Sequence, residues 1–207
     1  MDSPSNRRAH WEKVWGTHPP DGVSWYAPHL AESLRLIREA APPDASIIDI
    51  GAGASTLVDD LLDAGLSRLT VLDISEAALD VARARLGLRA QGVTWLHADI
   101  ATAALPSGAY DVWHDRAVFH FLTEQADRDA YVAALNHSLR HGGSAVIGTF
   151  ALNGPARCSG LDVIRYDASG IQRALGPEFA LTAAAEQTHV TPDGRPQEFV
   201  ICRLRRS

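Results

Sequence analysis

The chain has 207 residues, of which 46% are hydrophobic and 21% charged, and its formal net charge is −6. This is ordinary globular composition, and an acidic balance gives no general attraction to nucleic-acid phosphates or anionic lipid. Its two cysteines are too few for a disulfide framework. No secretory signal is apparent and no apolar run approaches the roughly 18 residues of a membrane span. We therefore expect a cytoplasmic protein that binds neither nucleic acid nor membrane.

The N-terminal part of the chain is rich in aromatic residues and precedes the first expected strand. A helix is expected over residues 28–40, where apolar residues recur at helical spacing before a Pro-Pro pair. We interpret residues 1–43 as a helical cover segment and residues 44–207 as one domain. The aromatic residues are Trp11, Trp15, Trp25 and Tyr26.

From residue 46 onward, short apolar runs alternate with helical patterns, which predicts an α/β fold with a doubly wound, mostly parallel sheet. Two longer strands near the C-terminus flank a Pro-Asp-Gly turn and form a predicted antiparallel hairpin. The expected strands are 46–50, 69–72, 93–97, one starting at 110, 144–149, 179–190 and 197–204. The expected helices are 54–64, 75–86, 123–140 and 168–175, and residues 151–160 form an expected loop.

Ligands of an open parallel sheet bind beyond the carboxyl ends of its strands. The first strand ends at Gly51 and Gly53, and glycines let a ligand approach the backbone closely. The second strand delivers Asp73, at a spacing after the glycine turn that suits an acceptor for two ribose hydroxyls. The third delivers Asp99, a possible acceptor for an adenine amine, with Ile100 against the ring. Each acidic residue alone is equally consistent with a helix cap, but their joint placement indicates a nucleoside site.

The glycine turn does not suit a pyrophosphate. Thr56 stands where a dinucleotide-binding motif has its third glycine, which argues against a NAD-dependent dehydrogenase, and no phosphate-binding loop with Gly-Lys-Ser/Thr occurs. Asp49 beside the turn would repel a pyrophosphate but would suit a ligand that carries an ammonium and a sulfonium. Aromatic faces in the cover segment also suit a sulfonium, although these tryptophans are also consistent with simple packing anchors.

Four segments resemble the motifs of class I S-adenosylmethionine (SAM)-dependent methyltransferases, namely residues 48–55, 71–75, 98–100 and 110–116. The aromatic segment resembles the cover of small methyltransferases of the thiopurine and tellurite types, and of a methyltransferase-like group that includes protein lysine methyltransferases. The resemblance implies a Rossmann-like, seven-stranded sheet whose last strand is antiparallel and lies beside the fifth. It also implies SAM as cofactor and S-adenosylhomocysteine as product. The cofactor-binding residues that we expect are Trp15, Trp25, Asp49, Gly51, Gly53, Asp73, Ile74, Asp99, Ile100 and Asp115.

Three candidate catalytic residues follow the fourth strand, close to the expected position of the methyl group. His120 is the first candidate for a general base, because an unperturbed histidine titrates near neutral pH; the alternative is that it only packs there. His114 is the competing base. Asp115 is expected either to assist or to form an internal ion pair with Arg116.

The acceptor is expected to be a small molecule, bound by Tyr26, Arg116, Cys158 and His189, with the loop after the fifth strand as a lid. No metal is expected. A protein lysine methyltransferase and a SAM-binding module without catalysis remain alternatives. The Asn/Asp-Pro-Pro-Tyr/Phe motif of many nucleobase and amide methyltransferases is absent after the fourth strand, where Asp115 begins the sequence Asp-Arg-Ala-Val. The acceptor atom and the oligomeric state do not follow from the sequence.

Overall fold

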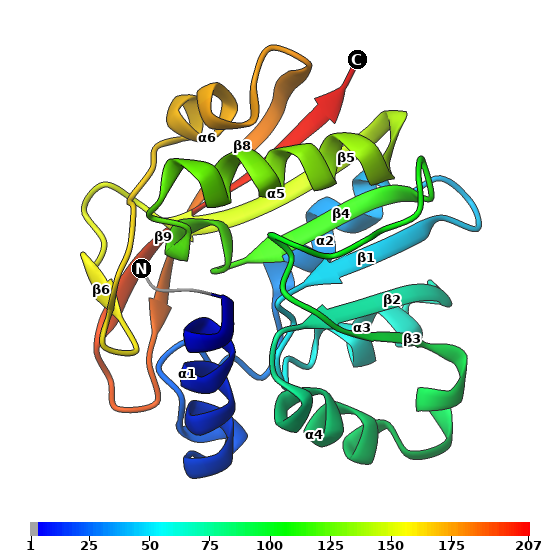
Figure 1. Cartoon of the computed structure of the whole chain (residues 1–207). Coiled ribbons are helices and arrows are strands. Elements are labelled where there is room, and N and C mark those ends of the chain that lie inside the picture. Colours follow the sequence, from blue (N-terminus) through cyan, green and yellow to red (C-terminus); the bar gives the residue numbers. More distant parts are fainter. Residues whose placement is uncertain (1–3) are drawn as a thin grey trace.

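A computed structural model describes residues 4–207, so residues 1–3 of the expected cover segment lie outside it. Its centre is a seven-stranded sheet with the strand order β3-β2-β1-β4-β5-β9-β8. Helices cover both faces of this sheet (Figure 1). The strands are β1 (Ser46–Ile50), β2 (Arg68–Asp73), β3 (Thr94–His97), β4 (Tyr110–Arg116), β5 (Leu139–Phe150), β8 (Phe179–Val190) and β9 (Pro196–Arg206).

The sheet has one reversed strand. Neighbouring strands from β3 to β5 pair in parallel, whereas β9 pairs antiparallel with both β5 and β8. The last strand of the chain is therefore inserted beside the fifth, as the resemblance implied. The predicted fold class, a doubly wound and mostly parallel sheet with a C-terminal antiparallel hairpin strand, is confirmed.

Two hydrophobic cores lie on opposite faces of the sheet, because successive strand side chains point to opposite sides. On one face, Ile47 and Val112 pack with apolar residues of the first three sheet-packing helices. On the other, Ile48 and Trp113 pack with the last two. The first group is α2 (Ala31–Ala40), α3 (Leu57–Asp63) and α4 (Glu76–Leu86), and the second is α5 (Gln125–Ser138) and α6 (Ala168–Leu175).

The cover segment divides into two parts with different roles. Helix α1 (Pro4–Thr17) lies beyond the carboxyl ends of the parallel strands (Figure 1). Helix α2 instead buries Leu36 and Ile37 completely in the core. Residues 31–40 therefore belong to the helical layer of the sheet, and the division of the chain at residue 43 stays a prediction.

Two local predictions are wrong for a physical reason. Strand β5 begins at Leu139 and runs through Gly142 and Gly143, whereas we expected the helix to reach residue 140 and the strand to begin at 144. At Gly143 an added Cβ would lie 3.0 Å from the Asp111 carbonyl oxygen, so close backbone packing requires this glycine. The expected loop 151–160 also contains structure, since β6 (Arg157–Cys158) pairs with β7 (Leu161–Asp162).

Three short 3₁₀ helices complete the described elements: η1 (Pro20–Gly22), η2 (Gly87–Gly92) and η3 (Phe119–Phe121). The last of these follows β4 directly and helps to form the end of the sheet where ligands are expected. None of the helices in residues 4–207 is long and apolar enough to cross a membrane.

Candidate cofactor and acceptor site

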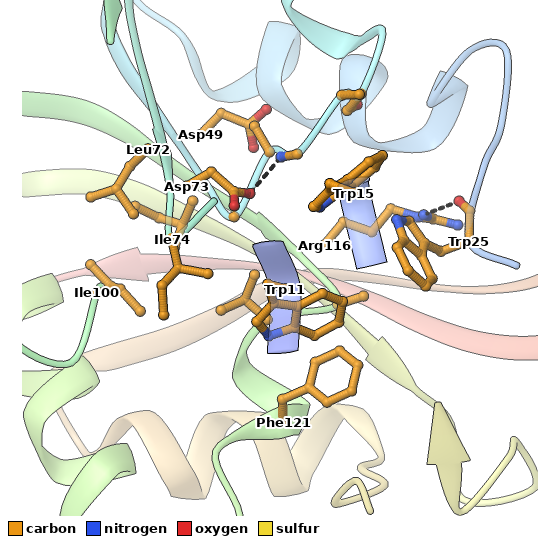
Figure 2. A pocket seen from close by; sticks show the side chains of 18 of the residues that line it. Trp11, Trp15, Trp25, Asp49, Leu72, Asp73, Ile74, Ile100, Arg116 and Phe121 are labelled. Carbon is orange, nitrogen blue, oxygen red and sulfur yellow. Dashed lines mark hydrogen bonds between the residues drawn. The ribbon is translucent and has the colours of Figure 1, made fainter. Parts of the chain in front are cut away.

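A cavity lies between the carboxyl ends of the strands and helix α1 (Figure 2). Most of the residues that we predicted for the site line it. These are Trp15, Trp25, Tyr26, Asp49, Gly51, Gly53, Asp73, Ile74, Asp99, Ile100, His114, Arg116 and Cys158. Asp115, His120 and His189 do not belong to the lining.

The glycine turn after β1 needs both of its glycines. Gly51 and Gly53 have φ angles of 58° and 56°, in the left-handed region that other residues rarely adopt. A Cβ on Gly51 would lie 2.0 Å from a methyl carbon of Val118, and one on Gly53 would lie 2.6 Å from the Trp15 ring. The turn therefore presents bare backbone to the cavity, with Trp15 of α1 directly against it.

Asp73 holds the same turn from the end of β2. Its carboxylate accepts hydrogen bonds from the backbone N–H groups of Gly53, at 2.7 Å, and Ser75, at 2.8 Å (Figure 2 shows the first). Burial raises its pKa to about 6; the two hydrogen bonds oppose this rise, and the nearby Asp49 and Glu12 add to it. Each carboxylate oxygen accepts one such bond and keeps acceptor capacity for a further donor, such as a ribose hydroxyl.

His114 is engaged at both ring nitrogens. Nδ1 lies 2.6 Å from an Asp49 carboxylate oxygen, and Nε2 lies 2.9 Å from the Ser33 hydroxyl of α2. The side chain is 2% exposed. Because neither nitrogen is left for a substrate proton, this geometry argues against the base role that we considered. It makes His114 the residue that orients Asp49 toward the glycine turn.

Asp99 is held by a residue that the sequence did not single out. Its Oδ2 accepts hydrogen bonds from Arg7 of α1, at 3.1 Å from Nε and 2.9 Å from Nη2, and its Oδ1 accepts one from the Ala101 N–H at 3.0 Å. Arg7 also pairs with Asp127 of α5 at 2.5 Å. Asp99 thus joins the cover helix to the segment after β3, and its contact with an adenine stays a prediction.

A second set of hydrogen bonds, which we call a latch as we do the contacts of Arg7, joins Glu12 of α1 to the first turn of α4. Glu12 accepts hydrogen bonds from the Ser75 hydroxyl at 2.9 Å and from the Glu76 N–H at 2.8 Å. A carboxylate at a helix N-terminus is stabilised by the free N–H groups and the helix dipole. Glu12 was also missed, because an acidic residue in a surface helix carries no distinctive sequence signal.

Aromatic side chains of the cover pack edge to face over the cavity. Trp25 contacts Trp11 and Trp15 with ring centroids 5.8 and 5.9 Å apart, and Trp11 contacts Phe121 of η3 at 5.0 Å. This T-shaped packing joins the cover to the segment after β4. Phe121 was not among the predicted residues, although it follows His120 directly.

The Asp115 carboxylate is used to hold the turn after β4. Its carboxylate accepts hydrogen bonds from the N–H groups of Val118 and Phe119, at 2.9 and 3.0 Å, and from the Tyr131 hydroxyl at 2.7 Å. These bonds shape the turn after β4, and the expected ion pair with Arg116 is not formed. The geometry therefore argues against both the cofactor-binding and the catalytic role of Asp115.

His120 is also unsuited to the base role. It is fully buried, and its Nδ1 accepts a hydrogen bond from the Phe150 N–H at 3.2 Å. Burial, with Arg116 nearby, lowers the pKa of its imidazole to about 3. A ring that stays neutral, and whose accepting nitrogen is already bonded to the backbone, is a poor proton acceptor.

The remaining predicted acceptor residues lie near Ser24 of the cover. His189 donates a hydrogen bond from Nε2 to the Ser24 carbonyl oxygen at 2.8 Å, so it anchors the cover from β8. Cys158 lines the cavity, with its Sγ 4.0 Å from the Ser24 hydroxyl oxygen, and burial raises the pKa of this thiol. Within the part of the chain that the structure describes, no group of three or more His, Cys, Asp or Glu side chains is placed to hold a metal ion.

We divide the lining of the cavity by position and name each half after the ligand that we expect in it. The cofactor half is the lining at the ends of β1, β2 and β3, namely Asp49, Gly51, Gly53, Asp73, Ile74 and Ile100. The acceptor half is the lining near the end of β4, namely Trp25, Tyr26, Arg116, Phe121 and Cys158, of which Trp25 was predicted to contact the cofactor. Figure 2 shows Arg116 and Trp25 on the side away from Ile74 and Ile100.

The geometry and the comparisons with known proteins define the class. Residues 47–143 match the methyltransferase domain family. Residues 47–143 therefore carry a methyltransferase domain, and the glycine turn, Asp73 and the aromatic cover fit SAM as its cofactor.

The chain is similar to an uncharacterised methyltransferase of Mycobacterium tuberculosis, with 32% identity over 72% of this chain and 62% of the relative. It is also similar to the mouse eEF1A lysine and N-terminal methyltransferase, with 26% identity over 52% of this chain and 15% of the relative. The chain thus spans less than two thirds of either relative.

Two solved structures share the fold. A SAM-dependent methyltransferase from Anabaena variabilis has a TM-score of 0.79 and 16% identity, and the match covers 100% of this chain and 96% of that one. The 1,6-didemethyltoxoflavin-N1-methyltransferase of Burkholderia thailandensis, solved with bound 1,6-didemethyltoxoflavin and S-adenosylhomocysteine, has a TM-score of 0.69 and 18% identity. That match covers 100% of this chain and 92% of that one.

Proposed function

We propose that the protein transfers a methyl group from SAM to a small molecule. The observation that carries this proposal is the lining of the acceptor half, where side chains of the cover, η3 and β6 meet near the end of β4. An acceptor that fits among Trp25, Phe121 and Cys158 must be small or must enter as a narrow side chain. The neighbour that acts on a toxoflavin precursor supports a small acceptor by analogy of fold.

The chain's own residues would orient the reaction and exclude water. SAM supplies an activated methyl group. Asp73 and the glycine turn would fix the nucleoside and methionine portions, which directs the methyl toward the next strand end, that of β4. The aromatic cover would remove water and hold the acceptor in line at about 3–3.5 Å from the methyl carbon. Neither His114 nor His120 is placed as a base, so this arrangement suits an acceptor that is already a nucleophile at neutral pH.

Transfer to a protein lysine is the second candidate, because several relatives act on lysine residues of an elongation factor. One feature of the cavity opposes it. Arg116 lines the acceptor half, and a guanidinium there would repel a lysine ammonium. The acidic lining residues, Asp49, Asp73 and Asp99, all lie on the strands and turns of the cofactor side.

The test is incubation with SAM labelled in the methyl group and a cell extract divided into protein and small-molecule fractions. We expect label in the small-molecule fraction, with formation of S-adenosylhomocysteine, and neither with an Asp73→Asn variant. Label confined to protein would favour the lysine candidate. Failure to bind S-adenosylhomocysteine by calorimetry would contradict the proposed function altogether.

A further inference from the structure

Arg116 is a cation without a counter-charge. Its Nη1 donates a hydrogen bond to the Trp25 carbonyl oxygen at 3.0 Å, and its Cζ lies 4.5 Å from the centre of the Phe199 ring. Its Nε is out of contact with solvent and has no hydrogen-bond partner among the described residues. No carboxylate of residues 4–207 forms an ion pair with it, in contrast to Arg7 and most surface arginines.

The groups that surround Arg116 do not supply the missing charge. His120 and His189 are neutral at pH 7, since burial lowers the pKa of both rings, that of His120 to about 3. Cys158 is a neutral thiol, because burial raises its pKa. Burial lowers the pKa of Arg116 itself to about 10, so the guanidinium remains protonated at neutral pH. A buried charge without a partner is costly unless a ligand compensates it.

Arg116 lies where we expect the acceptor to bind. It ends β4, the next strand after β1 in the direction that leads away from β2 and β3. Trp25 lies beside it (Figure 2), and Phe121 lines the same cavity. A molecule bound there would place an apolar body among the rings and a polar group at the guanidinium.

We propose that Arg116 binds a carboxylate of the methyl acceptor, and that the acceptor is a small organic acid with an apolar or aromatic body. Because the Trp25 carbonyl uses Nη1 and the protein covers Nε, Nη2 is the donor left for an oxygen of a carboxylate in a charge-assisted hydrogen bond. The inference rests on the proposed function and deepens it.

Binding to the protein loaded with S-adenosylhomocysteine tests this inference without knowledge of the true acceptor. Benzoate is the probe, benzamide its neutral isostere, and phenyl phosphate a second oxyanion, each titrated while the fluorescence of the cavity tryptophans is recorded. We expect benzoate to saturate below about 10 mM and to bind at least about tenfold more tightly than benzamide. Equal affinity of the acid and the amide, or no binding of either, would overturn the inference.

Variants assign the binding to the guanidinium. Arg116→Gln should abolish the preference for benzoate, and Arg116→Lys should keep only part of it, because a lysine keeps the charge but is shorter and cannot place a donor where Nη2 lies. Arg157→Gln is the matched control, since Arg157 neighbours Cys158 but is exposed and paired with Asp162. Unchanged binding of benzoate by Arg116→Gln would overturn the inference. Tighter binding of phenyl phosphate than of benzoate would also overturn it, because the acceptor would then carry a phosphate and not a carboxylate.

The two proposals fail in different ways. Calorimetry should show the same affinity for S-adenosylhomocysteine, within about twofold, in the wild-type protein and in Arg157→Gln, and thermal unfolding should confirm that each variant is folded. Loss of cofactor binding in the wild-type protein contradicts the proposed function. Normal cofactor binding without a preference for the acid contradicts only the identity of the acceptor.

Discussion

The cofactor half and the acceptor half of the cavity are built from different parts of the chain. In the cofactor half, backbone geometry dominates: Gly51 and Gly53 adopt left-handed conformations, and Asp73 binds two backbone N–H groups. These residues lie within one stretch of the sequence. In the acceptor half, side chains from the cover, η3 and β6 meet at the end of β4, and none is close to all the others in sequence.

This difference explains why the sequence indicates the cofactor but not the acceptor. A turn that must present bare backbone leaves glycines and an acidic residue at fixed spacing, and that spacing is shared by a whole class of enzymes. An acceptor pocket made of side chains can change residue by residue without changing the fold. The predictions below test whether the two halves are as separate as the geometry indicates.

The largest effect is expected at the glycine turn. Gly51→Val should abolish binding of S-adenosylhomocysteine, because the residue would need a φ of 58° and its Cβ would lie 2.0 Å from a methyl carbon of Val118. Calorimetry and thermal unfolding measure the effect. Gly65→Val is the control, since Gly65 has a φ of 81° but no atom within 4 Å of an added Cβ. Near-normal binding by a folded Gly51→Val protein would contradict the position of the cofactor.

Asp73→Asn is expected to weaken binding of S-adenosylhomocysteine by roughly 10- to 100-fold, the effect of losing charge-assisted hydrogen bonds to two hydroxyls. The protein should remain folded, because an asparagine oxygen can still accept one backbone bond. Isothermal calorimetry gives the affinity. A change of less than twofold would show that the ribose does not contact Asp73.

The affinity of the wild-type protein should also depend on pH. The pKa of Asp73 is raised to about 6, and ribose hydroxyls donate to the ionised carboxylate. Affinity should therefore rise as pH increases through about 6, and this rise should be absent in Asp73→Asn. The stability effect has the opposite sign: a folded pKa above the ordinary value of 3.8 favours the folded state at low pH, and this contribution is lost as pH rises toward 6.

The sequence showed which strand ends line the cavity, whereas the contacts of these residues with cofactor and acceptor stay predictions. The glycines, Asp73, Ile74 and Ile100 line the cavity as expected, because strand ends in a parallel sheet converge on one edge. His120 and Asp115 follow the same logic and fail, since the chain turns after β4 and buries both. Position along a strand shows which edge a residue reaches, but not whether its side chain faces the cavity.

The sequence did not predict the ion pairs and hydrogen bonds that hold α1 against the rest of the protein. Arg7 is one of many arginines in a polar segment, and its partners Asp99 and Asp127 lie more than 90 residues away in the sequence. Only the fold brings them together. The same holds for Glu12 at the start of α4, so the latches could be found only in three dimensions.

Arg7→Gln tests whether these latches join the cover to the cofactor half. Loss of the ionic hydrogen bonds to Asp99 should increase hydrogen exchange in α1 by about tenfold or more, while exchange in the central strands stays unchanged. S-adenosylhomocysteine should slow exchange in α1 of the wild-type protein. Arg8→Gln is the matched control, because Arg8 is the next residue in the helix and is exposed. Equal exchange in the two variants would contradict the latch.

The smallest effect on the reaction is expected at His120. A fully buried imidazole with a pKa of about 3 is neutral throughout the range in which the protein would work. His120→Asn, whose amide oxygen can replace Nδ1 as acceptor for the Phe150 N–H, should therefore leave the single-turnover rate within about threefold from pH 6 to pH 9. An NMR titration of the wild-type ring should show no protonation down to about pH 5.

His120→Leu separates a structural from a chemical role at this position. It leaves the buried Phe150 N–H without an acceptor, so it should lower the free energy of unfolding by about 1–3 kcal/mol. If His120 were instead the base, His120→Asn would slow single turnover by about 100-fold and remove a pH inflection, with cofactor affinity intact. That outcome would mean that the segment after β4 rearranges when ligands fill the cavity. Binding in the cofactor half would then change the acceptor half through η3.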